Sequence, residues 1–101
     1  MELFYDSPLR GVTFSPAKEN LIELGRGFKD LELTLKHMPD NKYDKFAIAV
    51  MCENKQIGWI PKEYNYNMVK YGVENLVCVF KSYTLFNLDV SGVDISVYGK
   101  L

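Results

Sequence analysis

The feature of this sequence that most limits its fold is the short, regular spacing of its apolar segments. Stretches of roughly five to eight apolar residues alternate with turn residues throughout the chain. In residues 31–35 and 93–98 every second side chain is apolar, which is the period of a half-buried strand. Long helices that could cross over between parallel strands are missing from the pattern. The sequence therefore predicts a mostly-β domain, a small and partly open antiparallel barrel that closes most of its strand edges.

The expected elements can be placed by this punctuation. The pattern predicts about six strands, at residues 10–14, 31–35, 46–51, 56–60, 75–85 and 93–98. A first short helix is expected to begin with Ser15 as N-cap and Pro16 at the first helical position, and to end at Gly25 or Gly27. A second is expected to begin at residue 61, with an apolar stripe formed by Tyr64, Met68 and Tyr71, and to stop at Gly72.

Charge and cysteine content exclude several classes of function. The net charge is −1, and acidic and basic residues are spread evenly, which argues against a broad, charge-driven nucleic-acid binder but leaves room for a small basic site. Cys52 and Cys78 lie among apolar residues and are expected to be buried thiols, and the single histidine, His37, has no second histidine to share a metal ion.

No catalytic motif is present: the sequence has no phosphate-binding glycine loop, no nucleophile elbow and no paired carboxylates. We therefore expect a binding domain, not an enzyme, with no cofactor and no metal. The first residues lack the basic segment of a signal peptide, and no apolar run approaches the ~18 residues of a membrane span. These features predict a cytoplasmic protein that does not contact membranes.

One segment carries a candidate site. Residues 39–50 place two lysines, Tyr43 and Asp44 on a loop that runs directly into a buried strand, and a rigid strand holds such a loop still. The ring of Tyr43 could stack on a base, and Asp44 could accept a hydrogen bond from a hydroxyl group. In the alternative interpretation, this is ordinary turn chemistry in which Asp44 only binds amides of its own loop.

The ordered motifs resemble those of the HIRAN domain family. The pattern consists of a G-V-T-F segment at residues 11–14, an L-E-L-T-L strand at 31–35, the run D-N-K-Y-D-K-F-A-I-A-V at 40–50, and Q-I-G-W-I-P-K-E at 56–63. The likeness covers residues 10–99. It implies an N-terminal extension at residues 1–9, a HIRAN-like domain at 10–101, and an architecture similar to the OB-fold, in agreement with the barrel predicted above.

The resemblance also implies a function and a site. The best understood member of the family captures the 3′-hydroxyl end of single-stranded DNA. By that resemblance Tyr43 stacks on the terminal base, Asp44 accepts from the terminal hydroxyl, Phe14 offers a second aromatic surface, and Lys62 meets a phosphate. Trp59 is a further candidate, and we expect it to be either a partly exposed stacking platform or a core residue after Gly58.

Two positions depart from the DNA-end binders: Thr13 stands where an arginine is expected, and Trp59 stands where one member has a histidine. The expected role is a DNA-binding accessory in repair, replication or processing, with a helicase or nuclease as partner protein. The alternatives are a protein-interaction adaptor that kept the scaffold without the DNA site, and a subunit of a multi-chain nuclease.

Overall fold

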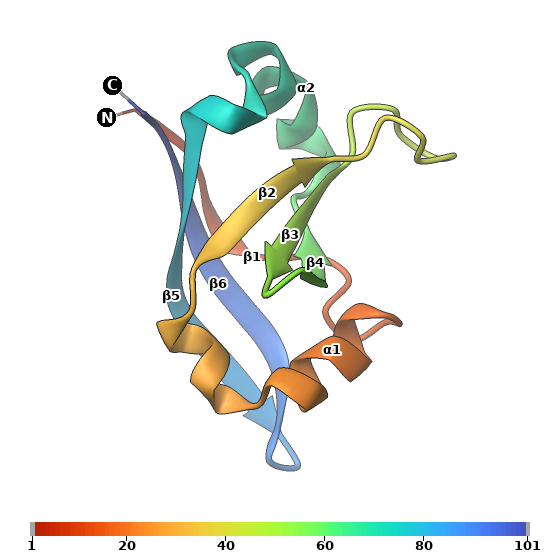
Figure 1. Cartoon of the computed structure of the whole chain (residues 1–101), viewed down its shortest axis with the longest axis vertical. Coiled ribbons are helices and arrows are strands. Elements are labelled where there is room, and N and C mark those ends of the chain that lie inside the picture. The colour runs from red at the N-terminus through yellow and green to blue at the C-terminus, as the bar shows by residue number, and fades with distance from the viewer. Residues whose placement is uncertain (1, 101) are drawn as a thin grey trace.

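The computed structural model describes residues 2–100 of the chain. Six strands, two α-helices and two short 3-10 helices follow one another along it (Figure 1). Their order is β1 (Leu3–Pro8), α1 (Ala17–Leu24), η1 (Arg26–Asp30), β2 (Leu33–His37), β3 (Ile48–Cys52), β4 (Lys55–Trp59), α2 (Lys62–Tyr71), η2 (Val73–Asn75), β5 (Leu76–Phe86) and β6 (Asp89–Gly99).

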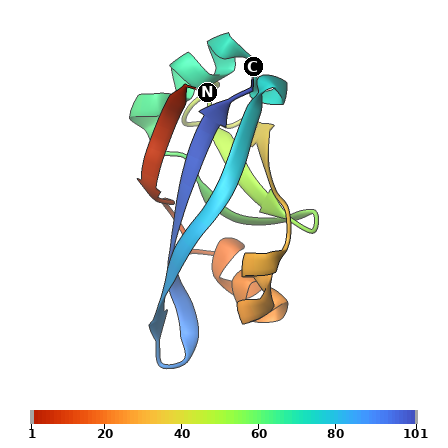
Figure 2. The ribbon, with the colours of Figure 1, turned by 90° about the vertical axis from the view of Figure 1, so that its left-hand side faces the viewer.

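All six strands belong to one antiparallel sheet, in the order β1-β6-β5-β2-β3-β4. The sheet curls into a half-barrel, and Figure 2 shows β1, β6 and β5 side by side as one wall. Its two ends approach each other where Arg10 and Trp59 exchange two main-chain hydrogen bonds, each 2.9 Å long. The barrel stays open between β2 and β5, which pair only at Leu33 and Cys78. The small OB-like barrel predicted from the sequence is therefore confirmed.

The core lies inside this curl. The alternation in β6 decides its inner face, since Val93, Ile95 and Val97 are all at most 1% exposed. Phe28 from η1 fills one end of the barrel and packs edge-on against the ring of Phe80, with ring centroids 5.4 Å apart. Other fully buried side chains come from α1, β3, β4 and α2, among them Leu21, Ile48, Val50, Ile57 and Met68.

The first strand expected at residues 10–14 is wrong. Gly11 has a φ of +74°, a left-handed conformation that interrupts an extended chain, and only Arg10 pairs with another strand. Leu9 and Val12 are buried, so the apolar pattern reflects burial in an irregular segment. The strand lies instead at Leu3–Pro8, where it pairs with β6. This part of the predicted N-terminal extension thus forms an edge of the sheet.

The remaining elements follow the expected chemistry, with shifted bounds. The first helix begins at Ala17 after Pro16, and Ser15 does not cap it, since its hydroxyl bonds the carboxylate of Glu19 instead. Gly25 ends that helix as expected. Strands β2 to β5 lie within about two residues of their predicted bounds, whereas β6 begins at Asp89, four residues before the predicted start, so element boundaries were the weaker part of the prediction.

Helix α2 lies at the end of the barrel opposite the tip of the β5–β6 hairpin (Figure 1). Met68 anchors it in the core, Tyr64 packs on the ring of Tyr5, and Tyr71 packs on the ring of Phe4. The stripe predicted on this helix is therefore a packing surface. None of the helices in residues 2–100 has the length and apolarity to cross a bilayer.

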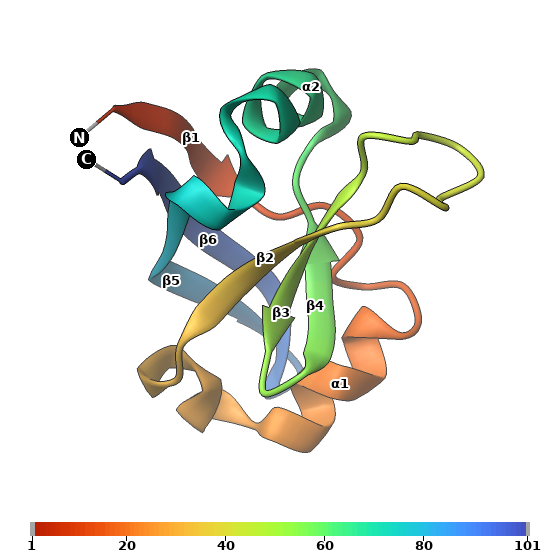
Figure 3. The ribbon, with the colours of Figure 1, turned by 45° about the horizontal axis from the view of Figure 1, so that its top comes forward.

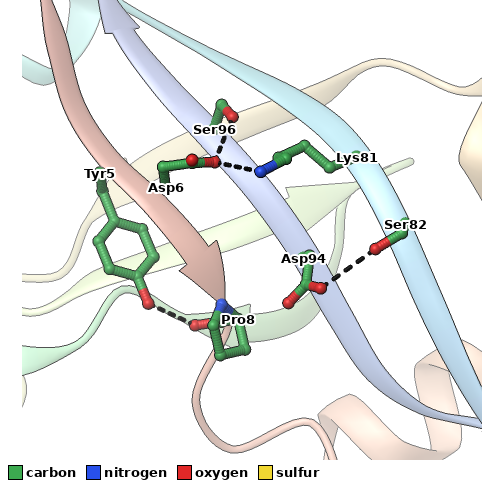
Figure 4. A network of polar contacts seen from close by, with 7 residues as sticks. All are labelled: Tyr5, Asp6, Pro8, Lys81, Ser82, Asp94 and Ser96. Carbon is green, nitrogen blue, oxygen red and sulfur yellow. Dashed lines mark hydrogen bonds and ion pairs between the residues drawn. The ribbon is translucent and has the colours of Figure 1, made fainter.

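A polar network crosses the outer face of the wall made by β1, β6 and β5 (Figure 4). Asp6 Oδ1 on β1 accepts hydrogen bonds from Lys81 Nζ on β5 (2.6 Å) and from Ser96 Oγ on β6 (2.8 Å). The hydrogen bond from Lys81, and after it the one from the Ser96 hydroxyl, hold the pKa of the Asp6 carboxyl below its usual value. The network ties the edge strand to the two strands of the central hairpin.

Candidate functional site

The loop that joins β2 to β3, residues 38–47, projects from the barrel beside α2 (Figure 3). Its base is closed by a hydrogen bond from the Met38 N–H to the carbonyl of Ala47 (2.8 Å). Inside it, the Asn41 side-chain oxygen accepts the N–H groups of Tyr43 (2.9 Å) and Asp44 (3.0 Å). The short Asn41 side chain thus accepts main-chain N–H groups that strand pairing would otherwise bind, and it fixes the loop backbone on both sides of residue 42.

Asp44 is the best-defined side chain of this loop. Its Oδ1 accepts the N–H of Phe46 (2.9 Å), and its Oδ2 accepts Nδ2 of Asn65 on α2 (3.0 Å). The Asn65 bond, and after it the Phe46 amide, hold the pKa of the Asp44 carboxyl below its usual value, and the charges of Lys62 and His37 act in the same direction. Asp44 is therefore an ionised acceptor at neutral pH, fixed in orientation from two directions.

Two further contacts hold the loop in place. The ring nitrogen Nε2 of His37 donates to the carbonyl of Lys45, 2.8 Å away. The ring of Phe46 meets Tyr66 of α2 at a centroid distance of 5.1 Å and an interplanar angle of 86°. The loop is thus joined to α2 by the Asn65–Asp44 hydrogen bond and by the Phe46–Tyr66 ring contact, so its side chains are presented on a fixed surface.

Aromatic rings and lysines alternate on this surface. The ring of Tyr43 is 80% exposed, and the Nζ atom of Lys42 lies 5.1 Å from its centroid. The Nζ atom of Lys45 lies 5.3 Å from the centroid of Phe46. Lys62, the first residue of α2, adds a third cation close enough to lower the pKa of Asp44. The loop therefore offers exposed ring faces beside positive charge, a combination that suits single-stranded nucleic acid.

The structure divides the predicted site residues into two groups. Asp44 and Lys62 come together, with Tyr43 beside them on the loop. The second group is defined by position: Phe14 lies in the segment at residues 10–14 and is 73% exposed, and Trp59 ends β4 and is half-buried beside Gly11 of that segment. Figures 1 and 3 show the segment after β1 on the same side of the molecule as loop 38–47.

Sequence reasoning missed the side chains of α2 that complete the site. Asn65 is 3% exposed and contacts Asp44 across 21 residues of sequence. A signal was present, since Asn65 lies three residues before Met68 and hence on the inner face of the helix, where a polar side chain requires a partner. Its Oδ1 atom is buried without a hydrogen-bond partner. Tyr66, the residue after Asn65, belongs to none of the sequence motifs.

The alternative interpretation of Asp44 is right in one respect, since one carboxylate oxygen does bind an amide of its own loop. Each carboxylate oxygen has two lone pairs, so both oxygens keep capacity for another donor. Within residues 2–100, histidine, cysteine and carboxylate side chains form no group of three that could hold a metal ion.

Comparison with known proteins shows the family of this chain. The family model of the HIRAN domain matches residues 6–101, nearly the whole chain. No curated protein and no solved structure matches the chain. The match begins inside β1, so it includes the second half of the edge strand that was expected to lie outside the domain. The chain therefore belongs to the HIRAN domain family, whose members are generally DNA-binding domains.

Proposed function

We propose that this domain binds the 3′-hydroxyl end of single-stranded DNA through the loop at residues 38–47 and the start of α2. The observation that carries the proposal is the Asp44 carboxylate, held by Phe46 and Asn65 beside the exposed ring of Tyr43. In this function Tyr43 stacks on the terminal base and Asp44 accepts a hydrogen bond from the terminal hydroxyl. The domain serves as an accessory to DNA repair, replication or processing, with a helicase or nuclease as partner.

The sign of the charge on Asp44 argues for a strand terminus. A carboxylate close to DNA is repelled by phosphates and is useful only where it meets a hydrogen-bond donor. The free 3′-hydroxyl is such a donor, and an internal phosphodiester has none. A fixed, ionised acceptor in a lysine-containing loop therefore favours an end over the middle of a strand.

The cations near Asp44 are few, so the interaction is expected to depend weakly on salt. Lys42, Lys45 and Lys62 are the three lysines that flank the site. Three neutralised phosphates on a single strand correspond to a log–log salt slope of about −2. A slope near −8 would indicate a broad basic groove and would contradict this account.

The test uses fluorescence anisotropy with a labelled thymidine hexamer ending in a 3′-hydroxyl or a 3′-phosphate. The unmodified protein should bind the hydroxyl end more tightly, and Asp44→Ala should remove this difference. The lost charge-assisted hydrogen bond is worth about 1.5–3 kcal/mol, roughly a 10- to 150-fold change in affinity. Equal binding of both ends and of a circular strand would refute end capture.

The adaptor function has one observation in its favour. The β5–β6 hairpin extends past the barrel, and its tip exposes three apolar side chains, Leu85, Phe86 and Leu88. Apolar side chains grouped in this way suit a protein surface better than a phosphate backbone. If no oligonucleotide binds at low salt, this tip is the surface to examine next.

A further inference from the structure

We propose that Tyr66, together with Phe46 and Lys45, forms a second nucleotide subsite that takes the base next to the terminal one. The inference rests on the proposed function and extends it, because it names a surface for the second nucleotide of the bound strand. Tyr66 lies outside the ordered motifs of the sequence, whereas Lys45 and Phe46 belong to the run at residues 40–50, and the inference is carried by the geometry of these side chains around Asp44.

One local unit, a lysine beside an aromatic ring, occurs twice in the loop. Lys42 and Tyr43 form a lysine–ring pair at 5.1 Å, and Lys45 and Phe46 form another at 5.3 Å. Asp44 lies between the two pairs in the sequence. Each pair supplies what one nucleotide of a single strand requires, namely a ring to stack on and a cation for its phosphate. The unit that contains Tyr43 is assigned to the terminal nucleotide, and the other unit has no assigned ligand.

Tyr66 presents a free surface to solvent. Its ring is 53% exposed, although it lies against Phe46. An interplanar angle of 86° means that only one of the two rings turns its face toward the other. The exposed part of Tyr66 beside this contact is available to a base.

The ring pair of Phe46 and Tyr66 is connected to both carboxylate oxygens of Asp44. The N–H of Phe46 donates to Asp44 Oδ1, and Asn65, the residue before Tyr66, donates to Asp44 Oδ2. Lys62 and Tyr66 are four residues apart on α2 and so lie on the same face of the helix, one turn apart. The second subsite thus adjoins the carboxylate that receives the end, and a strand that reaches Asp44 passes Phe46 and Tyr66.

The test is a double-mutant cycle between protein and DNA. Its DNA partners are a thymidine hexamer with a 3′-hydroxyl and the same hexamer lacking the base of the nucleotide before the last. Tyr66→Ala should weaken binding of the complete hexamer about 5- to 150-fold, the range for one stacked base. With the abasic hexamer the same substitution should change binding less than twofold. Tyr66→Phe, which keeps the ring, should bind both like the unmodified protein.

Controls separate this proposal from the proposed function. Phe86→Ala removes a ring that is more exposed, 69% against 53% for Tyr66, from the hairpin tip at the far end of the molecule and should leave both affinities unchanged. Tyr66→Ala should also keep the preference for a 3′-hydroxyl over a 3′-phosphate, which reports on Asp44 alone. If that preference is present but Tyr66 and the missing base act additively, the second subsite is wrong and end capture stands.

A second variant protects the test against loss of folding. Lys45→Gln changes only an exposed side chain of the loop, and it should lower the salt slope for the complete hexamer by about 0.7, the value for one phosphate of a single strand. An unchanged slope would remove Lys45 from the subsite. Absence of any oligonucleotide binding by the unmodified protein would overturn this inference and the proposed function together.

Discussion

Replacing Asn65 with aspartate places a second carboxylate against Asp44 and tests the contact on which the loop depends. The two side-chain atoms are 3.0 Å apart, and two unit charges at that distance repel by about 5.5 kcal/mol at an effective dielectric constant of 20. Protonation of one carboxyl is the cheaper route. For an ordinary aspartate it costs about 4 kcal/mol at pH 7 and about 1.5 kcal/mol at pH 5, and it restores a hydrogen bond between the pair.

The variant should therefore change the direction in which stability varies with pH. The pKa of Asp44 is lowered in the folded protein, so its contribution to the unmodified protein is complete above pH 3.8 and is lost only in stronger acid. Asn65→Asp should instead gain about 2.5 kcal/mol between pH 7 and pH 5, measured by urea denaturation. Asn65→Leu is the matched control, because it removes the same donor without adding a charge. Parallel curves for both variants would show that residue 65 does not meet Asp44.

Three further predictions concern the scaffold. Gly58→Ala should lower the free energy of unfolding, measured by urea denaturation, by about 1–3 kcal/mol, because the added Cβ would lie 3.0 Å from side-chain atoms of Leu9. The control Gly27→Ala should change this free energy by less than about 0.5 kcal/mol, because its Cβ would meet no atom within 4 Å. Cys78, whose pKa burial raises to about 12, and the buried Cys52, whose pKa is also raised, should resist a thiol reagent at pH 7.5 until denaturant is added; rapid labelling of native protein would contradict their burial. Asp6→Asn should make the melting temperature less sensitive to acid below pH 3.8, because Lys81 and Ser96 lower the pKa of Asp6 and its stabilising charge is lost as the pH falls through this lowered pKa. An unchanged acid profile would show that the network does not contribute to stability.

The sequence predicted the parts of the fold that follow from local patterns. The alternation of Val93, Ile95 and Val97 identified the buried face of β6 directly. The short gap between the strands predicted at residues 46–51 and 56–60 left room only for a tight connection, and in the structure Glu53 and Asn54, both with positive φ, join β3 to β4 there. Such elements are predictable because neighbouring residues alone decide their conformation.

Other parts depend on contacts between distant residues. Strand β1 has a single buried side chain, Tyr5, and ends in Asp6, Ser7 and Pro8, so no alternation marks it. It is a strand because the edge of β6 is available to pair with it. The segment after it looked like a strand because Leu9 and Val12 are buried, although Gly11 turns the chain there.

The candidate site shows the same division. The resemblance to a known pattern indicated Tyr43 and Asp44 on the loop and Lys62 at the start of α2. The partners on α2 could not be found in that way, because the bond between Asp44 and Asn65 and the ring contact between Phe46 and Tyr66 exist only after the helix packs beside the loop. Propensity and motif describe single elements, whereas these contacts depend on how two elements meet.

The most direct test of the central claim is a titration of isotopically labelled protein with a 3′-hydroxyl thymidine hexamer, followed by the chemical shifts of the backbone amides. We expect the amide resonances of residues 41–46 and 62–66 to shift together and to report one affinity. A 3′-phosphate hexamer should shift them less, and the amide resonances of residues 85–89 at the hairpin tip should not shift. Shifts confined to the hairpin tip, or spread evenly over the barrel, would contradict it.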